Sequence, residues 1–300
     1  MSHSRIRVAA AIPCYNEARF IAEVVSRVRK HVDLVVVVDD GSTDGTAALA
    51  ERAGALVVRH DTNRGKGVAM NTAFAKAREL GVEAMVLLDG DGQHDPDEVP
   101  LVLQPVLSGE ADVAIGSRFL NGGKGIPLYR TIGQRILTLV ANLGTSMKMT
   151  DTQSGFRAYS PKALATLHFN QRQLGCVESE MQFLIRKKGL KALEVPITAI
   201  YRERAKRNPV AQGLGTFWPT LRLALRYRPT IFSALGGAAL SGLGTAGVML
   251  LAVAGLPFWA PASHWSSSGA LSLVAVGLLV VLGGSIVGPL HLKWKERRDD

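Results

Sequence analysis

One long stretch of the chain, residues 229–292, contains no Asp, Glu, Lys or Arg, although these four types make up 20% of the 300 residues. A straight helix of that length would measure about 96 Å, roughly three times the thickness of the hydrocarbon core of a bilayer. The segment must therefore turn, and "LPFWAPASHWSSS" at 256–268 has the prolines, tryptophans and serines of a short interfacial loop. We predict two transmembrane helices, at about 231–255 and 269–290. The alternative, a buried helical hairpin in a soluble protein, is disfavoured by the length of the charge-free stretch.

Basic residues flank this segment on both sides. They are Arg222, Arg226 and Arg228 before it, and Lys293, Lys295, Arg297 and Arg298 after it. Because Lys and Arg are in excess on the cytoplasmic side of membrane proteins, both termini are predicted to be cytoplasmic. The N-terminus has no apolar core long enough for a signal peptide. The sequence thus divides into a cytoplasmic domain (1–200), a basic amphipathic juxtamembrane segment (201–229), the two spans (230–292) and a cytoplasmic tail (293–300).

Composition narrows the possible partners. The formal net charge is +10, which suits nucleic acid, anionic lipid head groups or a phosphorylated substrate, and the membrane anchor argues against nucleic acid. Cys14 and Cys176 have neither metal-binding nor disulfide spacing, so we expect free thiols. Small residues recur every four positions in the first span, at Ala234, Ala238, Gly242 and Ala246. They could pack the two spans together or join copies into a homo-oligomer, and chance placement in a Gly- and Ala-rich span explains them almost equally well.

Apolar runs alternate with amphipathic, helix-like segments through the first part of the chain. The runs are residues 6–12, 33–38, 55–60, 83–88 and 111–116. Strands that are apolar throughout and separated by helices predict an α/β domain with a mostly parallel sheet covered on both faces. In such sheets ligands bind beyond the carboxyl ends of the strands. Polar motifs come directly after four of the runs, namely "PCYNE" (13–17), "DDGSTDGT" (39–46), "DGDGQH" (89–94) and "SRFLNGG" (117–123).

The third of these motifs contains two acids separated by one glycine. Asp89 and Asp91 leave a strand at positions i and i+2, so both carboxylates can turn toward one point, and Gln93 adds a neutral oxygen. Oxygen ligands of this kind suit Mg²⁺ or Mn²⁺ that also holds substrate phosphates. The alternative is a Gly/Asp turn that caps the next helix with Asp95 or Asp97. That alternative does not explain the two acids placed before it.

The second motif leaves two interpretations open. Asp39 or Asp40 at a strand end could accept hydrogen bonds from a ribose or a base, whereas Asp44 could simply cap the next helix. Neither GxGxxG nor GxxxxGK[ST] occurs in the sequence, so a dinucleotide-binding fold and a P-loop are not supported. Two arginines, Arg118 and Arg130, are basic candidates for the same edge. In the segment 201–229, basic and apolar residues are interleaved as in an interfacial helix.

Taken together, the motifs resemble those of family 2 glycosyltransferases, and specifically the polyprenyl-phosphate (dolichyl-phosphate) sugar synthases. The resemblance covers about residues 6–204 through "IPCYNE", "VDDGSTDGT", "NRGKGVAMNTAF", "DGDGQHDP", "GSRF" and "SGFRAY", in that order. It implies a GT-A fold followed by a two-helix transmembrane hairpin. It also implies transfer of a sugar from a UDP- or GDP-sugar to a lipid phosphate on the cytoplasmic face, with Mg²⁺ or Mn²⁺.

The same resemblance implies roles for individual residues. The nucleoside would be held by Pro13, Tyr15, Glu17, Val38 and Asp39 or Asp40. The metal and the donor diphosphate would be held by Asp89, Gly90, Asp91 and Gln93, and the acceptor phosphate by Arg118 and Arg130. Many relatives have a Ser-Lys pair where this chain reads "AKRNPV". The residues of this chain that correspond only approximately to that part of the relatives are Arg202, Arg204, Lys206 and Arg207. Roles for Asp151, Gln153, Arg157 and Glu180 stay open.

The chemistry suits these residue types. A metal ion can offset the negative charge that builds on a departing diphosphate, and a phosphate monoester near pH 7 is already mostly a dianion, so no strong base is needed. We expect direct displacement with inversion, from GDP-mannose, UDP-glucose or UDP-GlcNAc to dolichyl or undecaprenyl phosphate. Two alternatives remain: a glycosyltransferase whose acceptor is a hydroxyl group, and a non-catalytic membrane scaffold with the same fold.

Overall fold

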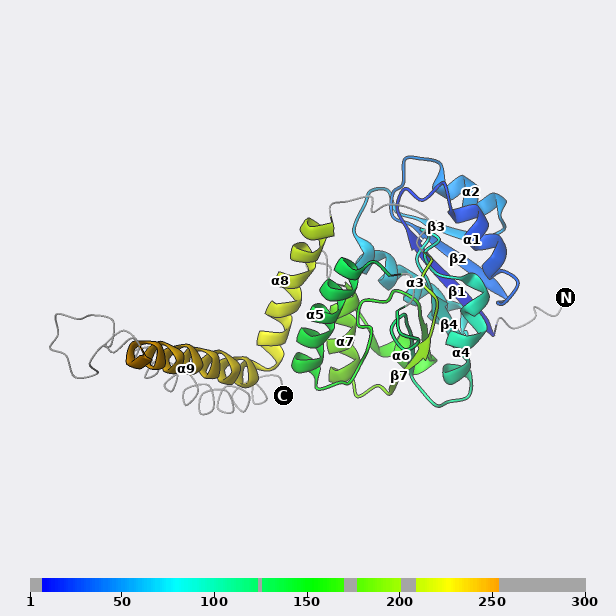
Figure 1. The fold of residues 1–300 in the computed structure, drawn as a ribbon. Helices are drawn as coiled ribbons and strands as arrows, with labels where there is room; N and C mark the ends of the chain where they lie inside the picture. Colours follow the sequence, from blue (N-terminus) through cyan, green and yellow to red (C-terminus); the bar gives the residue numbers. More distant parts are fainter. Residues whose placement is uncertain (1–6, 124–125, 170–176, 201–208, 254–300) are drawn as a thin grey trace. The chain divides into compact units, whose positions relative to one another are not determined.

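The computed structural model describes residues 7–123, 126–169, 177–200 and 209–253. The chain forms two compact units, Met1–Leu223 and Ala224–Asp300, and each is considered by itself. The first unit is built around one seven-stranded sheet with the strand order β3-β2-β1-β4-β6-β5-β7 (Figure 1). Its strands are β1 (Val8–Cys14), β2 (Leu34–Asp39), β3 (Leu56–Arg59), β4 (Ala84–Leu87), β5 (Val113–Ser117), β6 (Arg157–Tyr159) and β7 (Ala192–Pro196).

All five apolar runs form strands, which confirms the predicted α/β class. Each strand pairs in parallel with its neighbours except β6, which is antiparallel to both β4 and β5. The sheet is therefore mixed but mostly parallel. The sequence analysis did not predict β6 or β7, because neither is a continuous apolar run.

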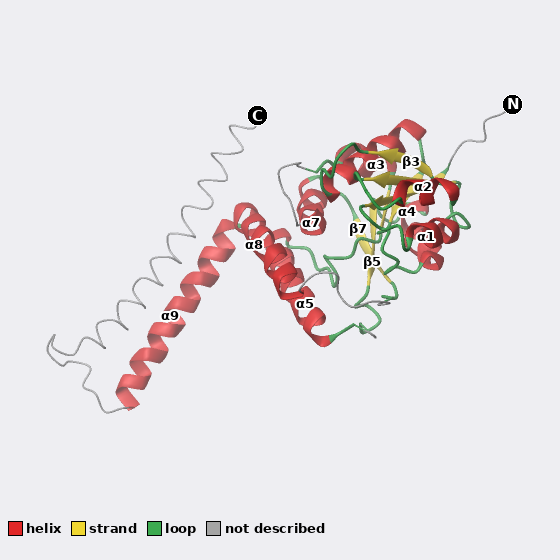
Figure 2. Cartoon of the chain, turned by 90° about the horizontal axis from the view of Figure 1, so that it is seen from above, coloured by secondary structure: helices red, strands yellow, loops and turns green. Residues whose placement is uncertain are grey.

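Helices cover both faces of the sheet, as Figure 2 shows with α1 and α3 on opposite sides of the strands. Alternate residues of β1 enter different cores: Ala9 and Ala11 pack toward one face, Ala10 and Ile12 toward the other. This period of two follows from strand geometry, and it explains why a strand buried on both faces is apolar throughout. The helices are α1 (Ile21–Val28), α2 (Thr46–Arg52), α3 (Lys66–Leu80), η1 (Pro96–Glu98), α4 (Val99–Leu107), α5 (Leu128–Thr145), α6 (Pro161–Thr166), α7 (Val177–Lys187), α8 (Pro209–Tyr227) and α9 (Pro229–Val253).

Strand register brings the polar motifs to one edge of the sheet. Cys14 at the end of β1 pairs with Asp39 at the end of β2, and Ala11 of β1 pairs with Leu87 at the end of β4. The antiparallel strand β6 begins at this same edge, since Arg157 pairs with both Leu87 and Ile115. The loop before β6 therefore lies at the same edge of the sheet as the motifs that follow β1, β2, β4 and β5.

Two described helices overlap the predicted juxtamembrane and first membrane-spanning segments. Helix α8 corresponds to most of the predicted juxtamembrane segment, and α9 overlaps the first predicted span, 231–255. Within the described parts of the chain, no helix is both long and apolar enough to cross a membrane. The second span at 269–290 and the tail at 293–300 lie outside the described residues, as do 201–208. The hairpin thus stays a prediction.

Candidate active site

Two loops at the sheet edge are joined by hydrogen bonds between them. The backbone N–H of Asn16 donates to Ser42 Oγ at 2.8 Å, and the N–H of Thr43 donates to Asn16 Oδ1 at 2.9 Å. Asn16 has a left-handed backbone with φ of 55°, a conformation that asparagine tolerates better than most residues. Tyr15, of which 44% is exposed, therefore extends from a loop whose backbone is fixed.

The other predicted nucleoside residues lie in or beside the strands. Pro13 of β1 pairs with Val38 of β2, and both residues are buried beneath the ligand edge of the sheet. Their side chains offer no polar group to a ligand. Glu17 lies in the same loop as Tyr15, and its N–H donates to Thr46 Oγ1 at 2.9 Å. Gly90 is needed for close packing, because a Cβ there would come within 3.1 Å of the Cβ of Cys14. Cys14 is a buried free thiol, as expected.

The structure separates Asp40 from Asp39. The Asp40 carboxylate accepts hydrogen bonds from the backbone N–H groups of Arg64 and Gly65 at 3.0 and 2.8 Å. It also lies 2.7 Å from Nδ1 of His60. Asp40 is almost fully buried, and both of its oxygens are used to hold the chain ahead of α3. The contacts of Asp40 are thus structural.

Asp39 still has acceptor capacity. Its Oδ1 accepts from the N–H of Ser42 at 3.0 Å, while its Oδ2 is buried without a hydrogen-bond donor. Nε of Arg59 is 3.2 Å from that oxygen, close enough for an ion pair but not aligned as a hydrogen bond. A buried carboxylate oxygen without a donor favours a ligand that supplies one. Of the two candidates, the geometry therefore favours Asp39 for base or ribose recognition.

Asp89 lies in a group of buried and half-buried charges. Lys66, the first residue of α3, places its Nζ 2.6 Å from Asp89 Oδ1 and 2.7 Å from Oε1 of Glu178 on α7. Burial alone would raise the pKa of Asp89, but the Lys66 ammonium outweighs it and holds that pKa well below its usual range. Burial also opposes the charge of Lys66, and the two carboxylates reverse this effect and raise its pKa. Asp89 and Lys66 are therefore both ionised near neutral pH.

Two further residues confine the Asp89 carboxylate. A Cβ on Gly155 would come within 2.5 Å of Asp89 Oδ2, so only glycine leaves room for the carboxylate. On the other side, Nε2 of the buried His94 is 3.7 Å from the same oxygen. Asp89 is thus held in place from several elements before any ligand binds.

Asp91 differs from Asp89 because no protein cation contacts it directly in the ion pairs of the described residues. Its oxygens accept from the backbone N–H of Gln93 at 3.0 Å and from the Gln93 side-chain amide at 2.6 Å. Burial and then the negative charge of Asp89 raise the pKa of Asp91. A cation shared by the two carboxylates would relieve this repulsion. Gln93, expected as a third ligand, turns its amide nitrogen toward Asp91 and so orients it.

The carboxylate oxygens of Asp89 and Asp91 suit a divalent cation that the protein and a substrate bind together. The described residues contain no group of three or more His, Cys, Asp and Glu side chains arranged to bind a metal by themselves. Mg²⁺ is commonly bound through one or two carboxylates, and phosphates and waters complete its shell. Asp89 and Asp91 match that pattern. The coordination shell of a cation bound here would be completed by oxygen atoms of a diphosphate.

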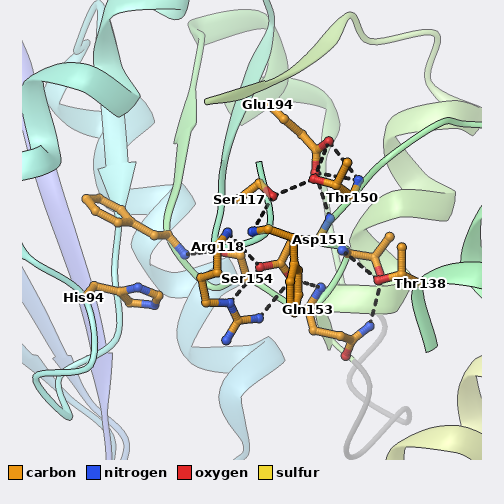
Figure 3. A network of polar contacts seen from close by, with 12 residues as sticks. His94, Ser117, Arg118, Thr138, Thr150, Asp151, Gln153, Ser154 and Glu194 are labelled. Atoms are coloured by element: carbon orange, nitrogen blue, oxygen red, sulfur yellow. Dashed lines mark hydrogen bonds and ion pairs between the residues drawn. The ribbon is translucent and has the colours of Figure 1, made fainter. Parts of the chain in front are cut away.

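Arg118 follows β5 and forms a two-pronged ion pair with Asp151. Its Nε and Nη2 donate to the two Asp151 oxygens at 2.7 and 2.9 Å, and its backbone N–H donates to Oδ2 at 3.2 Å (Figure 3). Asp151 is completely buried, and only 11% of the Arg118 side chain is exposed. Arg130, the other predicted phosphate ligand, lies half-buried in the first turn of α5.

The loop that carries Asp151 is tied down from several elements. Glu194 of β7 accepts from the backbone N–H groups of Thr150 and Asp151 (Figure 3). The side chain of Gln153 donates to Ser179 Oγ of α7 at 2.9 Å. Arg157 is 2% exposed and donates from Nε to the Ser154 carbonyl oxygen at 2.8 Å. These contacts assign Gln153 and Arg157 to loop architecture.

Several residues at the site were not recognised from the sequence. Lys66 had a signal, because "NRGKG" places a basic residue at the start of a helix at the ligand edge. Glu178 and Glu194 had none, since each meets its partner only through the tertiary fold, and Glu194 is 43 positions from Asp151. Glu180 is buried in α7. Four of the sequence candidates lie outside the described residues: Arg202, Arg204, Lys206 and Arg207.

Known proteins are similar to this chain in sequence. The model of the family "Glycosyl transferase family 2" matches residues 10–167. A UDP-N-acetylglucosamine–dolichyl-phosphate N-acetylglucosaminyltransferase of Methanococcus voltae is 33% identical over 239 residues, which cover 71% of this chain and 94% of that protein. An undecaprenyl-phosphate mannosyltransferase of Micrococcus luteus is 32% identical over 248 residues, covering 73% and 99% respectively.

Among solved structures, the chain is similar to glucosyl-3-phosphoglycerate synthase from Mycobacterium tuberculosis in complex with Mn²⁺, UDP-glucose and phosphoglyceric acid. The TM-score is 0.55 with 22% identity, and the match covers 73% of this chain and 80% of that one. At this identity the likeness concerns the fold alone. The predicted sheet architecture is thus found in a protein that was crystallised with a divalent metal and a nucleotide sugar.

Proposed function

Because this chain belongs to glycosyl transferase family 2, and is a glycosyltransferase, we propose that it transfers a hexose from a nucleotide-diphosphate sugar to a polyprenyl phosphate. The observation that carries the proposal is the placement of Arg118 at the same sheet edge as the carboxylates of Asp89 and Asp91. The carboxylates of Asp89 and Asp91 suit a cation bound to a diphosphate. The Arg118 guanidinium suits a second anion. The named relatives supply the acceptor class, since both act on a lipid phosphate by their names.

The donor would bind along the edge from β2 to β4. Asp39 is placed to accept N–H groups of the base or hydroxyls of the ribose, and Asp89 and Asp91 would hold Mg²⁺ or Mn²⁺ on the diphosphate. Such a cation supplies charge stabilisation for the departing diphosphate without proton transfer. Lys66 contributes a second positive charge 2.6 Å from Asp89, and Gln93 keeps Asp91 oriented.

The acceptor half requires cations rather than a base. A phosphate monoester has a second pKa of about 6 and is mostly a dianion at pH 7. The Arg118 guanidinium can bind such a group while holding it against the repulsion of the donor diphosphate. Asp151, the buried carboxylate nearest this arginine in the described contacts, accepts four hydrogen bonds and is not placed as a base. Attack by the phosphate oxygen on the anomeric carbon would invert its configuration.

The identity of the sugar and the base is a finer part of the proposal. We include GDP-mannose, UDP-glucose and UDP-GlcNAc as donors, since Asp39 accepts hydrogen bonds and both uracil and guanine carry ring N–H groups. The two named relatives differ in the sugar that they transfer. Dolichyl and undecaprenyl phosphates are both included as acceptors, because the names of the two relatives differ in the polyprenyl phosphate as well.

We also propose that the protein works at a membrane, with the catalytic domain and both termini on the cytoplasmic side. The charge-free stretch 229–292 supports this, and so does the exposed apolar surface of α5. On that helix Leu128, Tyr129, Ile132, Ile136 and Leu139 are each between 46% and 75% exposed. Exposed apolar side chains at helical spacing beside arginines are typical of a helix that contacts lipid. A homo-oligomer through the spans is retained as a prediction.

A donor screen tests the proposed reaction. Membranes containing the protein are incubated with polyprenyl phosphate and each labelled GDP- or UDP-sugar, and label in the lipid fraction is measured. We expect one donor to label the lipid in a reaction that requires a divalent cation. Label that appears only in protein or polysaccharide would support the alternative with a hydroxyl acceptor.

The arginines separate these alternatives further. Replacement of Arg118 and Arg130 by alanine is expected to raise the KM for polyprenyl phosphate strongly, because both cations would contact the acceptor phosphate. An acceptor KM and a kcat that stay unchanged in the double variant would contradict the proposed acceptor site.

A further inference from the structure

A relay of contacts runs from β7 to Arg118. Glu194 accepts the backbone N–H of Thr150 at 2.9 and 2.8 Å with its two oxygens, and the N–H of Asp151 at 2.8 Å. The Asp151 carboxylate in turn accepts Nε, Nη2 and the backbone N–H of Arg118. Figure 3 shows this order of contacts, with Asp151 between Glu194 and Arg118. A residue on an edge strand is thus connected to the candidate acceptor-binding cation through one buried aspartate.

The relay fixes the orientation of the guanidinium. Nε and Nη2 form one side of the planar group, and both point at Asp151. The third nitrogen, Nη1, is on an edge of the planar group that does not face Asp151. A long, flexible arginine side chain loses rotamer entropy when it is fixed on a ligand. Because Asp151 already fixes the side chain, less of that entropy is lost when an anion binds.

The hydrogen bonds of Asp151 argue against a role as a base. Both oxygens receive donors, since Oδ2 accepts two N–H groups of Arg118 and Oδ1 accepts Nη2 of Arg118 and the N–H of Gln153. The carboxylate is completely buried, so its charge must be compensated, and Arg118 compensates it. Taking a proton would require breaking this arrangement. Asp151 is suited to holding Arg118 rather than to reacting.

On the basis of the proposed function, we infer that Asp151 and Glu194 are positioning residues for the acceptor phosphate. Asp151 holds Arg118 in the orientation that binds the phosphate, and Glu194 holds the backbone that carries Asp151. Neither residue contacts the reacting atoms.

The test compares Asp151→Asn and Glu194→Gln with wild type in the full-length protein. We expect the KM for polyprenyl phosphate to rise about 10- to 100-fold in Asp151→Asn, as for other residues that orient a ligand-binding group. We expect a smaller rise in Glu194→Gln. The donor KM, and kcat at saturating acceptor, should change less than about threefold in both.

The chain offers a matched control in Glu98. Its carboxylate accepts the backbone N–H of Thr198 at 2.9 and 3.0 Å, so it ties down a loop after β7 in the same manner. Glu98 has no contact with Asp151 or Arg118 among the described hydrogen bonds. Glu98→Gln should therefore leave the acceptor KM unchanged. Thermal unfolding of all variants shows whether a loss of fold accompanies any kinetic change.

A double-mutant cycle tests the relay itself. Because Glu194 acts through Asp151, adding Glu194→Gln to Asp151→Asn should raise the acceptor KM no further. Additive effects would mean that the two residues act independently and would overturn the relay. If Asp151→Asn does not fold, Glu194→Gln compared with Glu98→Gln decides alone, and equal KM values for these two contradict the inference.

Other outcomes are equally decisive. If Asp151→Asn abolishes kcat, leaves the acceptor KM unchanged and removes the acidic limb of the pH profile, Asp151 is a base and the inference is wrong. If the double replacement of Arg118 and Arg130 leaves the acceptor KM unchanged, the proposed acceptor site is wrong. The proposed function stands and only the inference fails if replacing the two arginines raises the acceptor KM while replacing Asp151 and Glu194 leaves it unchanged.

Discussion

Adjacent aspartates at the end of β2 show how surroundings decide the role of a residue. Asp40 is used by two backbone N–H groups and by His60, whereas Asp39 keeps one buried oxygen without a hydrogen-bond donor. Asp89 and Asp91 differ in a comparable way. Lys66 neutralises Asp89, while the negative charge of Asp89 adds to burial in raising the pKa of Asp91. Asp91 is thus the carboxylate whose charge most needs an external cation.

Replacement of Asp91 by asparagine tests this assignment. We expect kcat/KM to fall about 10²- to 10³-fold, because removing one charge-stabilising group of an active site typically costs that much. The fold should be retained, since Asp91 is only half-buried and its hydrogen bonds come from Gln93. Initial rates measured against Mn²⁺ concentration should show a higher metal requirement. Asp97→Asn, an exposed acid nearby that pairs with Arg27, is the control, and equal activity of the two variants would refute the role of Asp91.

At the scale of elements, the start of α2 shows how a short helix is anchored at the ligand edge. Gly45 is the residue before the helix and has a left-handed φ of 84°. The Asp44 carboxylate accepts the N–H of Thr46 at 3.1 Å and that of Ala18 at 3.0 Å. Asp44 therefore caps the helix, as one of the sequence interpretations proposed, and it also joins α2 to the loop after β1.

The Asp44 contacts predict a pH-dependent contribution to stability. Burial alone would raise the pKa of Asp44, but hydrogen bonds from Thr46 and Ala18 outweigh it and lower that pKa. A lowered carboxyl pKa means that the stabilisation is present above the unfolded pKa and is lost as the pH falls through the folded one. Asp44→Ala should cost about 1 kcal/mol or less at pH 7, since the group is exposed.

The measurement is denaturant unfolding of Asp44→Ala and wild type at pH 7 and pH 3. We expect the difference in unfolding free energy to shrink at the lower pH. Asp61→Ala, at an exposed position in the next loop along the sheet edge, is the control for the loss of one surface carboxylate. A difference for Asp44→Ala that is independent of pH would rule out the charged cap.

At the scale of the whole molecule, the catalytic unit combines a ligand edge with an apolar surface. Helix α5 contributes to both, because its buried Thr138 contacts Thr152 in the Asp151 loop while its opposite face exposes large apolar residues. A lipid-linked acceptor has a charged head and an apolar tail. The two faces of α5 match those two parts, which supports the proposal that the bilayer contacts this side of the catalytic unit.

Charged replacements on α5 test the bilayer contact. In Ile132→Glu/Leu139→Glu, transfer to long-chain polyprenyl phosphate in vesicles should fall at least about tenfold, because two carboxylates oppose contact with lipid. Transfer to a short, water-soluble prenyl phosphate should be unaffected. The matched control is Leu101→Glu/Leu107→Glu on α4, where two leucines are similarly exposed. Equal losses with both acceptors, or in the control, would argue against a membrane-facing α5.

The sequence by itself determined the α/β class, the five apolar strands and the edge at which the polar motifs meet. It could do so because strands buried on both faces must be apolar over their whole length, and parallel strands end at one edge. The motifs also indicated the family, which the comparisons confirmed. The charge-free stretch predicts two spans, and this prediction stands untested for the residues beyond 253.

Only the tertiary structure decided what each polar residue does at that edge. Lys66, Glu178, Asp151 and Glu194 are far apart in the sequence, and each acquires its role from a partner that folding brings within about 3 Å. The antiparallel strand β6 was equally invisible, since three residues carry no periodic signal, yet it delivers the Asp151 loop to the site. Hydrophobic pattern is local and sets the elements, whereas the pairing of charges is non-local and depends on how those elements pack.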